Sequence, residues 1–239
     1  MNSIESKPSA EISKCVRIQA DNVFLLGDLQ IPEQSSSIVV FAYAGGRCQN
    51  NPRNRHVAQM IRQQGIGTLL CDFLTEDEEI EDEISEKYRH DAVLLANRLM
   101  AVTRWLAEEP DSKGLRMGFY GVCAGGAAAL IAAAKLGDKV GAVVTRGGRI
   151  DLAVKSLPQV KCPVMLVVGE MDTVGLELNR EALPHLKCPK HLEVVPGASH
   201  LFGEPGKLHE LSKLTARWFR KHLPEATSRT ESVPEIYSK

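Results

Sequence analysis

The sequence has almost no net charge and no long hydrophobic run. Its 29 Lys and Arg residues nearly balance 30 Asp and Glu residues, so its charge does not indicate binding to nucleic acid or to an anionic membrane. No apolar run approaches the roughly 20 residues of a transmembrane helix. The segment from Met1 to Pro8 lacks the apolar core of a secretory signal peptide. We therefore expect a cytoplasmic protein that acts on a small molecule, with no nucleic-acid or membrane partner.

Closely spaced cysteine pairs are also missing. The six cysteines are dispersed along the chain, and none belongs to a C-x-x-C pair, which is typical of a reduced intracellular protein. Cys188 and His191 lie close together in the sequence, but no second pair completes a zinc site. We therefore expect no metal and no other cofactor.

Neither repeats nor a linker divide the 239 residues, a length within reach of one α/β domain. We expect a flexible leader over residues 1–12, one domain over 13–223 and a disordered polar tail over 224–239. Eight stretches are predicted to be strands, and the central ones are nearly continuous in apolar residues, which is typical of burial on both faces. They are Cys15–Ile18, Val23–Leu29, Ser37–Tyr43, Gly67–Phe73, Leu115–Tyr120, Val140–Thr145, Pro163–Val168 and Leu192–Val195.

Helices are predicted between most of these strands. Apolar residues three and four apart predict a helix after Pro52, a long helix from Tyr88 to Leu106 and a last helix from Leu208 to Phe219. Residues 127–135 form a helix of small residues, and the acidic run from Glu76 to Glu83 is interpreted as solvated loop or helix start. The alternation predicts a mostly parallel eight-stranded sheet with helices on both faces. The later intervals are too short for a lid domain.

The stretch around Cys123 has the pattern of a nucleophile elbow. A short apolar strand runs into Gly121-Val122-Cys123-Ala124-Gly125, and the small-residue helix follows at once. Glycines two residues to either side let the strand and helix approach closely around a strained nucleophile. The free N–H groups at the helix start favour negative charge. We therefore expect Cys123 to react as the thiolate rather than to serve as a buried structural cysteine.

An acid and a histidine follow Cys123 in the order that an elbow nucleophile requires. Asp172 and His200 each come directly after a predicted strand, so a parallel sheet would bring both to the edge that carries Cys123. His200 would accept the thiol proton, and Asp172 would orient the imidazole ring. Glu170, two residues earlier on the same strand exit, is the alternative acid. We prefer Asp172 because the acid normally emerges from the turn after the strand.

Two further sets of groups are expected at this edge. The oxyanion hole would combine the backbone N–H groups of Ala124 and Gly45, with Ala44 as the alternative to Gly45. Arg146 and Arg149 follow the strand after the elbow, so either side chain is a candidate for binding an anionic group of the substrate. The competing interpretation of both arginines is an ion pair with Asp151 or with the acidic run.

Over nearly all of residues 13–223 the chain resembles the dienelactone hydrolase family of α/β-hydrolases. A G-x-C-x-G elbow is characteristic of that family, and the resemblance implies a Cys-His-Asp triad. The segments 52–55, 146–149 and 198–202 resemble a bacterial branch that usually has serine at the position of Cys123. Two departures bear on the substrate: Tyr43-Ala44-Gly45 lacks the family's glutamate, and Leu201 to Glu204 lacks its carboxylate-binding arginine. The resemblance thus implies hydrolase chemistry without implying dienelactone as the substrate.

These patterns favour a cofactor-free hydrolase of small esters or lactones that works through an acyl-cysteine intermediate. A thioesterase or an acyltransferase would use the same residues with another substrate or acceptor. A non-catalytic binding protein on the same scaffold is the alternative from another class, because a fold does not entail an activity.

Overall fold

The computed structural model describes residues 11–223, and the sites considered below all lie in that range. Eight strands form one sheet in the order β1-β2-β4-β3-β5-β6-β7-β8. Their bounds are β1 (Ile12–Ala20), β2 (Val23–Ile31), β3 (Ser37–Ala42), β4 (Gly67–Cys71), β5 (Arg116–Val122), β6 (Val140–Arg146), β7 (Val164–Gly169) and β8 (Lys190–Val195). The pairs β1–β2 and β2–β4 are antiparallel, and every later pair is parallel.

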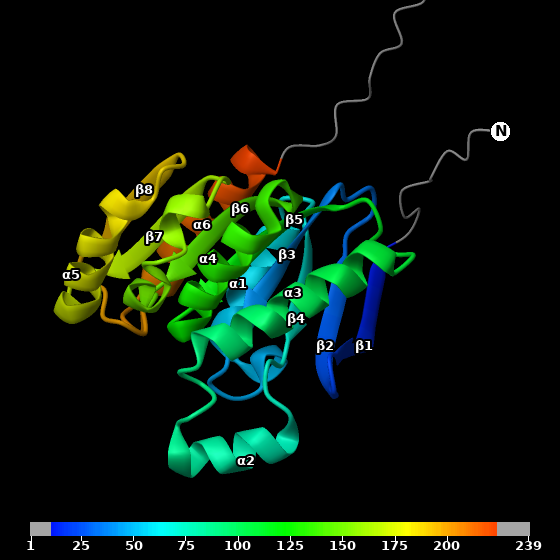
Figure 1. The fold of residues 1–239 in the computed structure, drawn as a ribbon. Coiled ribbons are helices and arrows are strands. Elements are labelled where there is room, and N and C mark those ends of the chain that lie inside the picture. Colours follow the sequence, from blue (N-terminus) through cyan, green and yellow to red (C-terminus); the bar gives the residue numbers. More distant parts are fainter. Residues whose placement is uncertain (1–10, 224–239) are drawn as a thin grey trace, which may run out of the picture.

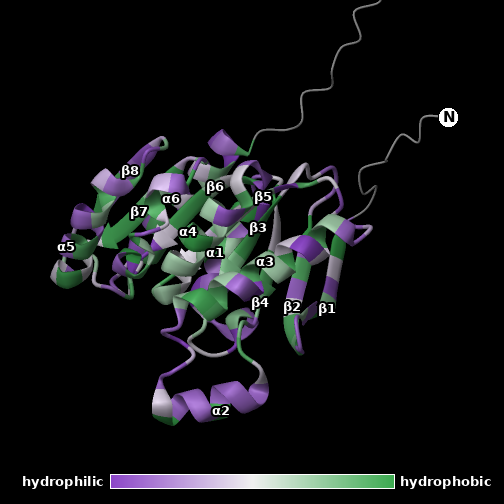
Figure 2. Cartoon of the chain, in the orientation of Figure 1, coloured by the Kyte–Doolittle hydropathy of each residue, from purple (hydrophilic) through white to green (hydrophobic). Residues whose placement is uncertain are grey.

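Helices cover both faces of the sheet (Figure 1). On one face α3 (Ala92–Glu108) packs against α4 (Ala124–Leu136), with α5 (Thr173–Ala182) beside them. On the other face α1 (Pro52–Arg62) packs against α6 (Lys207–His222). The central strands β3, β4, β6 and β7 are buried at every residue, and they form the apolar centre of Figure 2. This arrangement confirms the predicted α/β-hydrolase architecture.

The remaining helix, α2 (Glu76–Ser85), projects from the body at the edge where β4 ends (Figure 1). Its start is a capping box, in which the Thr75 hydroxyl accepts from the Glu78 N–H while the Glu78 carboxylate accepts from the Thr75 N–H. The guanidinium of Arg98 on α3 also donates to Glu78, at 2.6 Å and 2.7 Å. The predicted acidic run is therefore a helix, largely solvated as expected, and Arg98 holds its first turn.

Two predicted boundaries differ from the structure. The long helix predicted from Tyr88 begins only at Ala92, because Asp91 caps it by accepting from the N–H groups of Val93 and Leu94. Tyr88 lies in the preceding turn. The leader predicted over residues 1–12 falls outside the described residues except for its last two, and β1 already begins at Ile12. The tail predicted over 224–239 lies wholly outside them.

Candidate active site

The predicted elbow is present at the junction of β5 and α4. Cys123 connects them with φ 51° and ψ −122°, a backbone conformation that is costly for a residue with a Cβ. A Cβ on Gly121 would collide with the backbone of Gly125 and Gly126, and one on Gly125 would collide with the carbonyl of Ala42. Both glycines are therefore required for the close approach of strand, turn and helix around Cys123.

The structure brings Cys123, His200 and Asp172 into one chain of contacts. His200 Nε2 lies 3.2 Å from Cys123 Sγ, and His200 Nδ1 lies 2.6 Å from Asp172 Oδ2. Asp172 is also the N-cap of α5, since its Oδ1 accepts from the Gly175 N–H at 3.1 Å. One carboxylate oxygen thus fixes the acid to its helix, and the other faces the imidazole.

Glu170 lies on the same strand exit but takes no part in this chain of contacts. Its carboxylate accepts from the Gly197 N–H at 2.8 Å and so holds the turn after β8. Of the two candidate acids, Asp172 is therefore the one in contact with His200. The sequence preference for Asp172 agrees with this geometry.

The contacts of His200 favour its protonated form. Hydrogen bonding to Cys123 is the largest effect; burial opposes it and Asp172 adds to it, so that the pKa of His200 rises to about 9. The contacts with the sulfur and with the Asp172 carboxylate therefore both favour a proton on the imidazole.

The turn after β6 supports both the histidine and the elbow. Gly147 has φ +51°, and a Cβ there would lie 2.9 Å from Cε1 of His200, so only glycine leaves room for the ring. The buried amide of Asn179 on α5 donates to the Gly148 carbonyl at 2.9 Å. The Arg149 N–H donates to the Cys123 carbonyl at 3.0 Å. Sequence analysis did not identify the supporting role of this turn.

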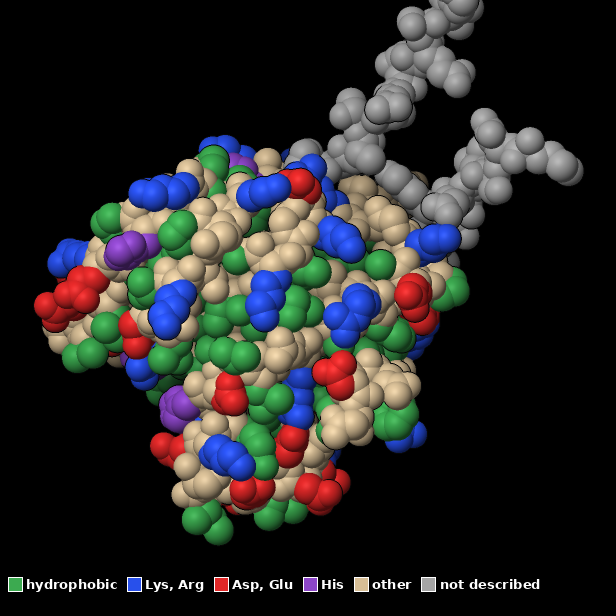
Figure 3. All heavy atoms as spheres, viewed as in Figure 1, with side chains coloured by type: hydrophobic (Ala, Val, Ile, Leu, Met, Phe, Trp, Pro, Cys, Tyr) green, Lys and Arg blue, Asp and Glu red, His purple; other side chains and the backbone are tan. Residues whose placement is uncertain are grey.

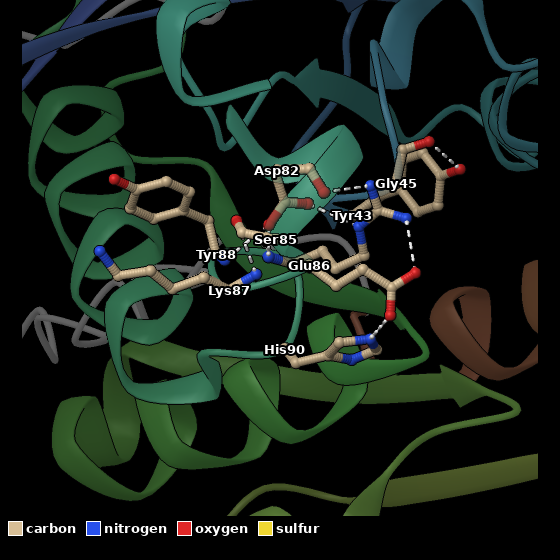
Figure 4. Close-up of polar contacts among 9 residues, drawn as sticks. Tyr43, Gly45, Asp82, Ser85, Glu86, Lys87, Tyr88 and His90 are labelled. Carbon is tan, nitrogen blue, oxygen red and sulfur yellow. Dashed lines mark hydrogen bonds and ion pairs between the residues drawn. The ribbon is translucent and has the colours of Figure 1, made fainter. Parts of the chain in front are cut away.

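Cys123 opens into a cavity of about 210 Å³. The cavity is lined by Ala124 and Gly45, the predicted oxyanion residues, and by Ala44, the alternative. As the first residue of α4, Ala124 has an N–H without a partner inside the helix. The loop of Gly45 is held by Tyr43, whose hydroxyl donates to the Gly45 carbonyl at 2.6 Å (Figure 4).

The two predicted arginines have different environments. Arg146 is 4% exposed and lines the cavity, and its Nη1 has no hydrogen-bond partner among residues 11–223. Arg149 is not among the lining residues, and its guanidinium pairs with Asp151 at 2.9 Å and 2.8 Å. The anion-binding interpretation therefore fits Arg146, whereas the competing ion-pair interpretation fits Arg149.

Sequence analysis missed one wall of the cavity. Arg89 and His90, in the turn after α2, line it together with Arg53 at the start of α1. Buried Asp82 fixes this turn by accepting from Arg89 Nε and from the N–H groups of Tyr88 and Arg89 (Figure 4). Arg89 and His90 follow an acidic run and belong to no recognisable sequence motif, so only the fold shows that they reach the cavity.

Within residues 11–223 no group of three His, Cys, Asp or Glu side chains is arranged to hold a metal ion. In the same range no helix has both the length and the apolar character to cross a bilayer.

A strained elbow on a mostly parallel sheet, with an acid and a histidine after later strands, defines the class of α/β-hydrolases. Residues 25–221 match the Dienelactone hydrolase family, and the chain belongs to that family. It is similar to the crystal structure of a dienelactone hydrolase from Anabaena variabilis ATCC 29413. The identity is 43% and the TM-score 0.86, over 89% of this chain and 99% of that one.

Two further similarities are informative. Est1E from Butyrivibrio proteoclasticus superposes with a TM-score of 0.73 over 87% of this chain and 98% of its own, but at 14% identity it shows the shared fold alone. A Mycobacterium tuberculosis H37Rv protein that carries a provisional phosphoribosyl transferase name is 45% identical over 208 residues. That match spans 87% of this chain but only 46% of the relative. The chain thus corresponds to about half of that longer protein.

Proposed function

We propose that this chain hydrolyses small carboxylic esters or lactones through an acyl-cysteine intermediate on Cys123. The observation that carries the proposal is the contact chain from Cys123 Sγ through His200 to Asp172, with distances of 3.2 Å and 2.6 Å. Cys123 lies at the N-terminal end of α4 and lines a small cavity. Membership of the dienelactone hydrolase family supports hydrolysis as the reaction class.

The geometry supports a two-step reaction. The Cys123 thiolate attacks the carbonyl carbon, and the oxyanion that forms accepts hydrogen bonds from the N–H groups of Ala124 and Gly45. Protonated His200 then gives its proton to the leaving alkoxide, which departs and leaves the acyl group on sulfur. Neutral His200 next takes a proton from water, whose oxygen attacks the thioester and releases the acid. Asp172 orients the ring and stabilises its charge throughout.

The cavity bounds the substrate. Its volume of about 210 Å³ is below the roughly 300–1,000 Å³ of sites that enclose drug-sized ligands, so we propose a short acyl group. Arg146 is the proposed contact for an anionic part of the substrate. A thioesterase or an acyltransferase would use the same intermediate, with a thiol leaving group or another acceptor in place of water.

The test is a screen of purified protein against short-chain nitrophenyl esters, lactones and acyl thioesters. We expect turnover of at least one class, and its loss in Cys123→Ala. Cys15→Ala is the matched control, because Cys15 is an exposed thiol far from the site in sequence and sheet position. Full activity of Cys123→Ala would contradict the proposal, and a protein inert towards all three classes would favour a binding function.

The name of the mycobacterial relative, which is 45% identical over the 46% of its length that this chain matches, makes phosphoribosyl transfer a second candidate. Measuring pyrophosphate release from phosphoribosyl pyrophosphate tests it. Release that persists in Cys123→Ala would support this candidate and would place its chemistry away from the elbow.

A further inference from the structure

The active-site cavity contains a buried positive charge that no acidic side chain of residues 11–223 neutralises. The Arg146 side chain is almost fully buried, and within residues 11–223 it forms no ion pair and its Nη1 has no hydrogen-bond partner. The buried hydroxyl of Tyr120 interacts with Arg146, which lowers the Tyr120 pKa while burial raises it. A buried charge without a carboxylate partner is strongly unfavourable, so Arg146 points to an anionic ligand that completes the site.

One further arginine of the cavity lining has no acidic partner. Arg53 lines the cavity, and its guanidinium has no ion pair or hydrogen bond among the described residues, whereas the other lining arginine, Arg89, pairs with buried Asp82. No Asp or Glu side chain is among the lining residues. Cys123 and His200 share one proton and carry no net charge as a pair, whether that proton lies on sulfur or on nitrogen. Two uncompensated guanidinium groups, Arg146 and Arg53, therefore remain.

We infer that this cavity binds the phosphate dianion of a phosphorylated acyl substrate, with Arg146 holding it at the buried end and Arg53 at the exposed end. This inference rests on the proposed function for the acyl part of the substrate. A phosphate monoester carries a charge close to −2 and three acceptor oxygens, which matches two guanidinium groups. A carboxylate supplies one charge and two oxygens. Arginine binds phosphate through parallel N–H···O bonds, so the fork of Arg146 suits this ligand.

The most direct probe is inorganic phosphate, and the readout is the rate at which neutral iodoacetamide alkylates Cys123. Phosphate in the cavity would block access to the sulfur without any need for turnover. At constant ionic strength and pH 7.5, we expect phosphate to slow alkylation in a saturable way and acetate or chloride to have far less effect. Absence of protection by phosphate, or equal protection by acetate, would overturn the inference.

The arginine variants test which side chains hold the anion. Losing charged hydrogen bonds should weaken phosphate protection about tenfold or more in Arg146→Gln and in Arg53→Gln. Arg55→Gln is the matched control: Arg55 lies on the same helix as Arg53, exposed and outside the cavity lining, so protection should be unchanged. Equal weakening in all three variants would indicate general charge attraction and would contradict a built site. If Arg146→Gln does not fold, Arg53→Gln decides.

Comparing the acetyl ester of glycerol 3-phosphate with that of glycerol separates this inference from the proposed function. A higher kcat/KM for the phosphorylated ester, lost in Arg53→Gln, supports both. Hydrolysis of both esters at equal rates, without phosphate protection, contradicts the inference alone. Phosphate protection with no hydrolysis of any ester contradicts the hydrolase proposal and leaves the anion site standing.

Discussion

The two walls of the active-site cavity are built in opposite ways. The wall that carries Cys123 and Ala124 consists of β5 and α4, both buried in the core along almost their whole length. The wall that carries Arg89 and His90 follows α2, which projects from the body (Figure 3) and exposes acidic side chains together with Ile80 and Ile84. Packing holds the first wall, whereas polar contacts of Asp82 hold the second.

We infer that the first wall carries the reacting group and that the second wall contacts the substrate. The packed strand and helix on either side of Cys123 leave its side chain little freedom to move, and catalysis requires such fixed positions. A turn held by one buried carboxylate contributes contacts to the substrate and can change without disturbing the elbow. We therefore expect changes around the elbow to act on kcat and changes around Asp82 to act on KM.

The largest effect should come from Asp172→Asn, because this change alters the contact chain from Cys123 through His200 rather than the wall that follows α2. Losing the charge that orients and stabilises the imidazolium should lower kcat on the order of 10²–10⁴-fold. Because Asp172 helps raise the pKa of His200 to about 9, the alkaline fall of kcat/KM, which reports groups of the free enzyme, should also move to lower pH. Glu170→Gln is the control and should be much milder, since Glu170 contacts the turn at Gly197. A larger loss in the control would contradict the acid assignment.

Cys123→Ser should change the shape of the pH–rate profile. Under the proposed mechanism His200 acts as an acid in the wild type, so kcat/KM should extend to low pH and fall as pH rises through about 9. A serine hydroxyl needs neutral His200 as base, and loss of the sulfur contact, the largest cause of the raised pKa, lowers that pKa. The kcat/KM of the variant should therefore rise with pH through this lower value. Superimposable profiles would refute the thiolate–imidazolium pair.

A smaller effect is expected from Asp82→Asn, on the polar wall. Burial alone would raise the pKa of Asp82, but hydrogen bonds from Arg89 and Tyr88 hold it below its ordinary value. The carboxylate therefore contributes to the turn at neutral pH, and this contribution is lost as the pH falls below the ordinary range of an aspartate. We expect KM to rise about tenfold with kcat nearly unchanged. Exposed Asp77→Asn on the same helix should change neither, and a fall in kcat alone would contradict the comparison.

Ile84→Ala should have the smallest effect of these changes. Ile84 is 92% exposed on α2, so its removal leaves no cavity, and alanine is the better helix former. The free energy of unfolding should stay within about 0.5 kcal/mol of the wild type, as measured by urea denaturation, with kcat and KM unchanged. A marked loss of stability would show that α2 packs against the body.

The sequence was sufficient to predict the sheet, the elbow and the contact chain for specific physical reasons. Continuous apolar runs identify the buried strands, and glycines spaced around Cys123 identify a turn that no other residue can form. The strand exits at Asp172 and His200 follow from the parallel topology. These features depend on local sequence and on one rule of sheet geometry.

The second wall of the cavity depends on contacts that the sequence does not display. Asp82 and Arg89 are seven residues apart across a helix end, and the course of the chain after Ser85 decides whether the turn faces Cys123 or solvent. The sequence also left open whether Arg146 or Arg149 binds an anionic group, because it does not show which of them has an acidic partner. Only the structure shows that Asp151 pairs with Arg149 and that Arg146 is buried with no carboxylate partner in the part of the chain that is described.

The most direct test of the central claim, an acyl-cysteine on Cys123, is mass spectrometry of protein quenched with acid during turnover of a short-chain nitrophenyl ester. We predict a mass increase of one acyl group that maps to the peptide containing Cys123, disappears in Cys123→Ala and accumulates when deacylation is slow. Turnover at full rate with no acyl group on Cys123, or with the label on another of the six cysteines, would contradict this account.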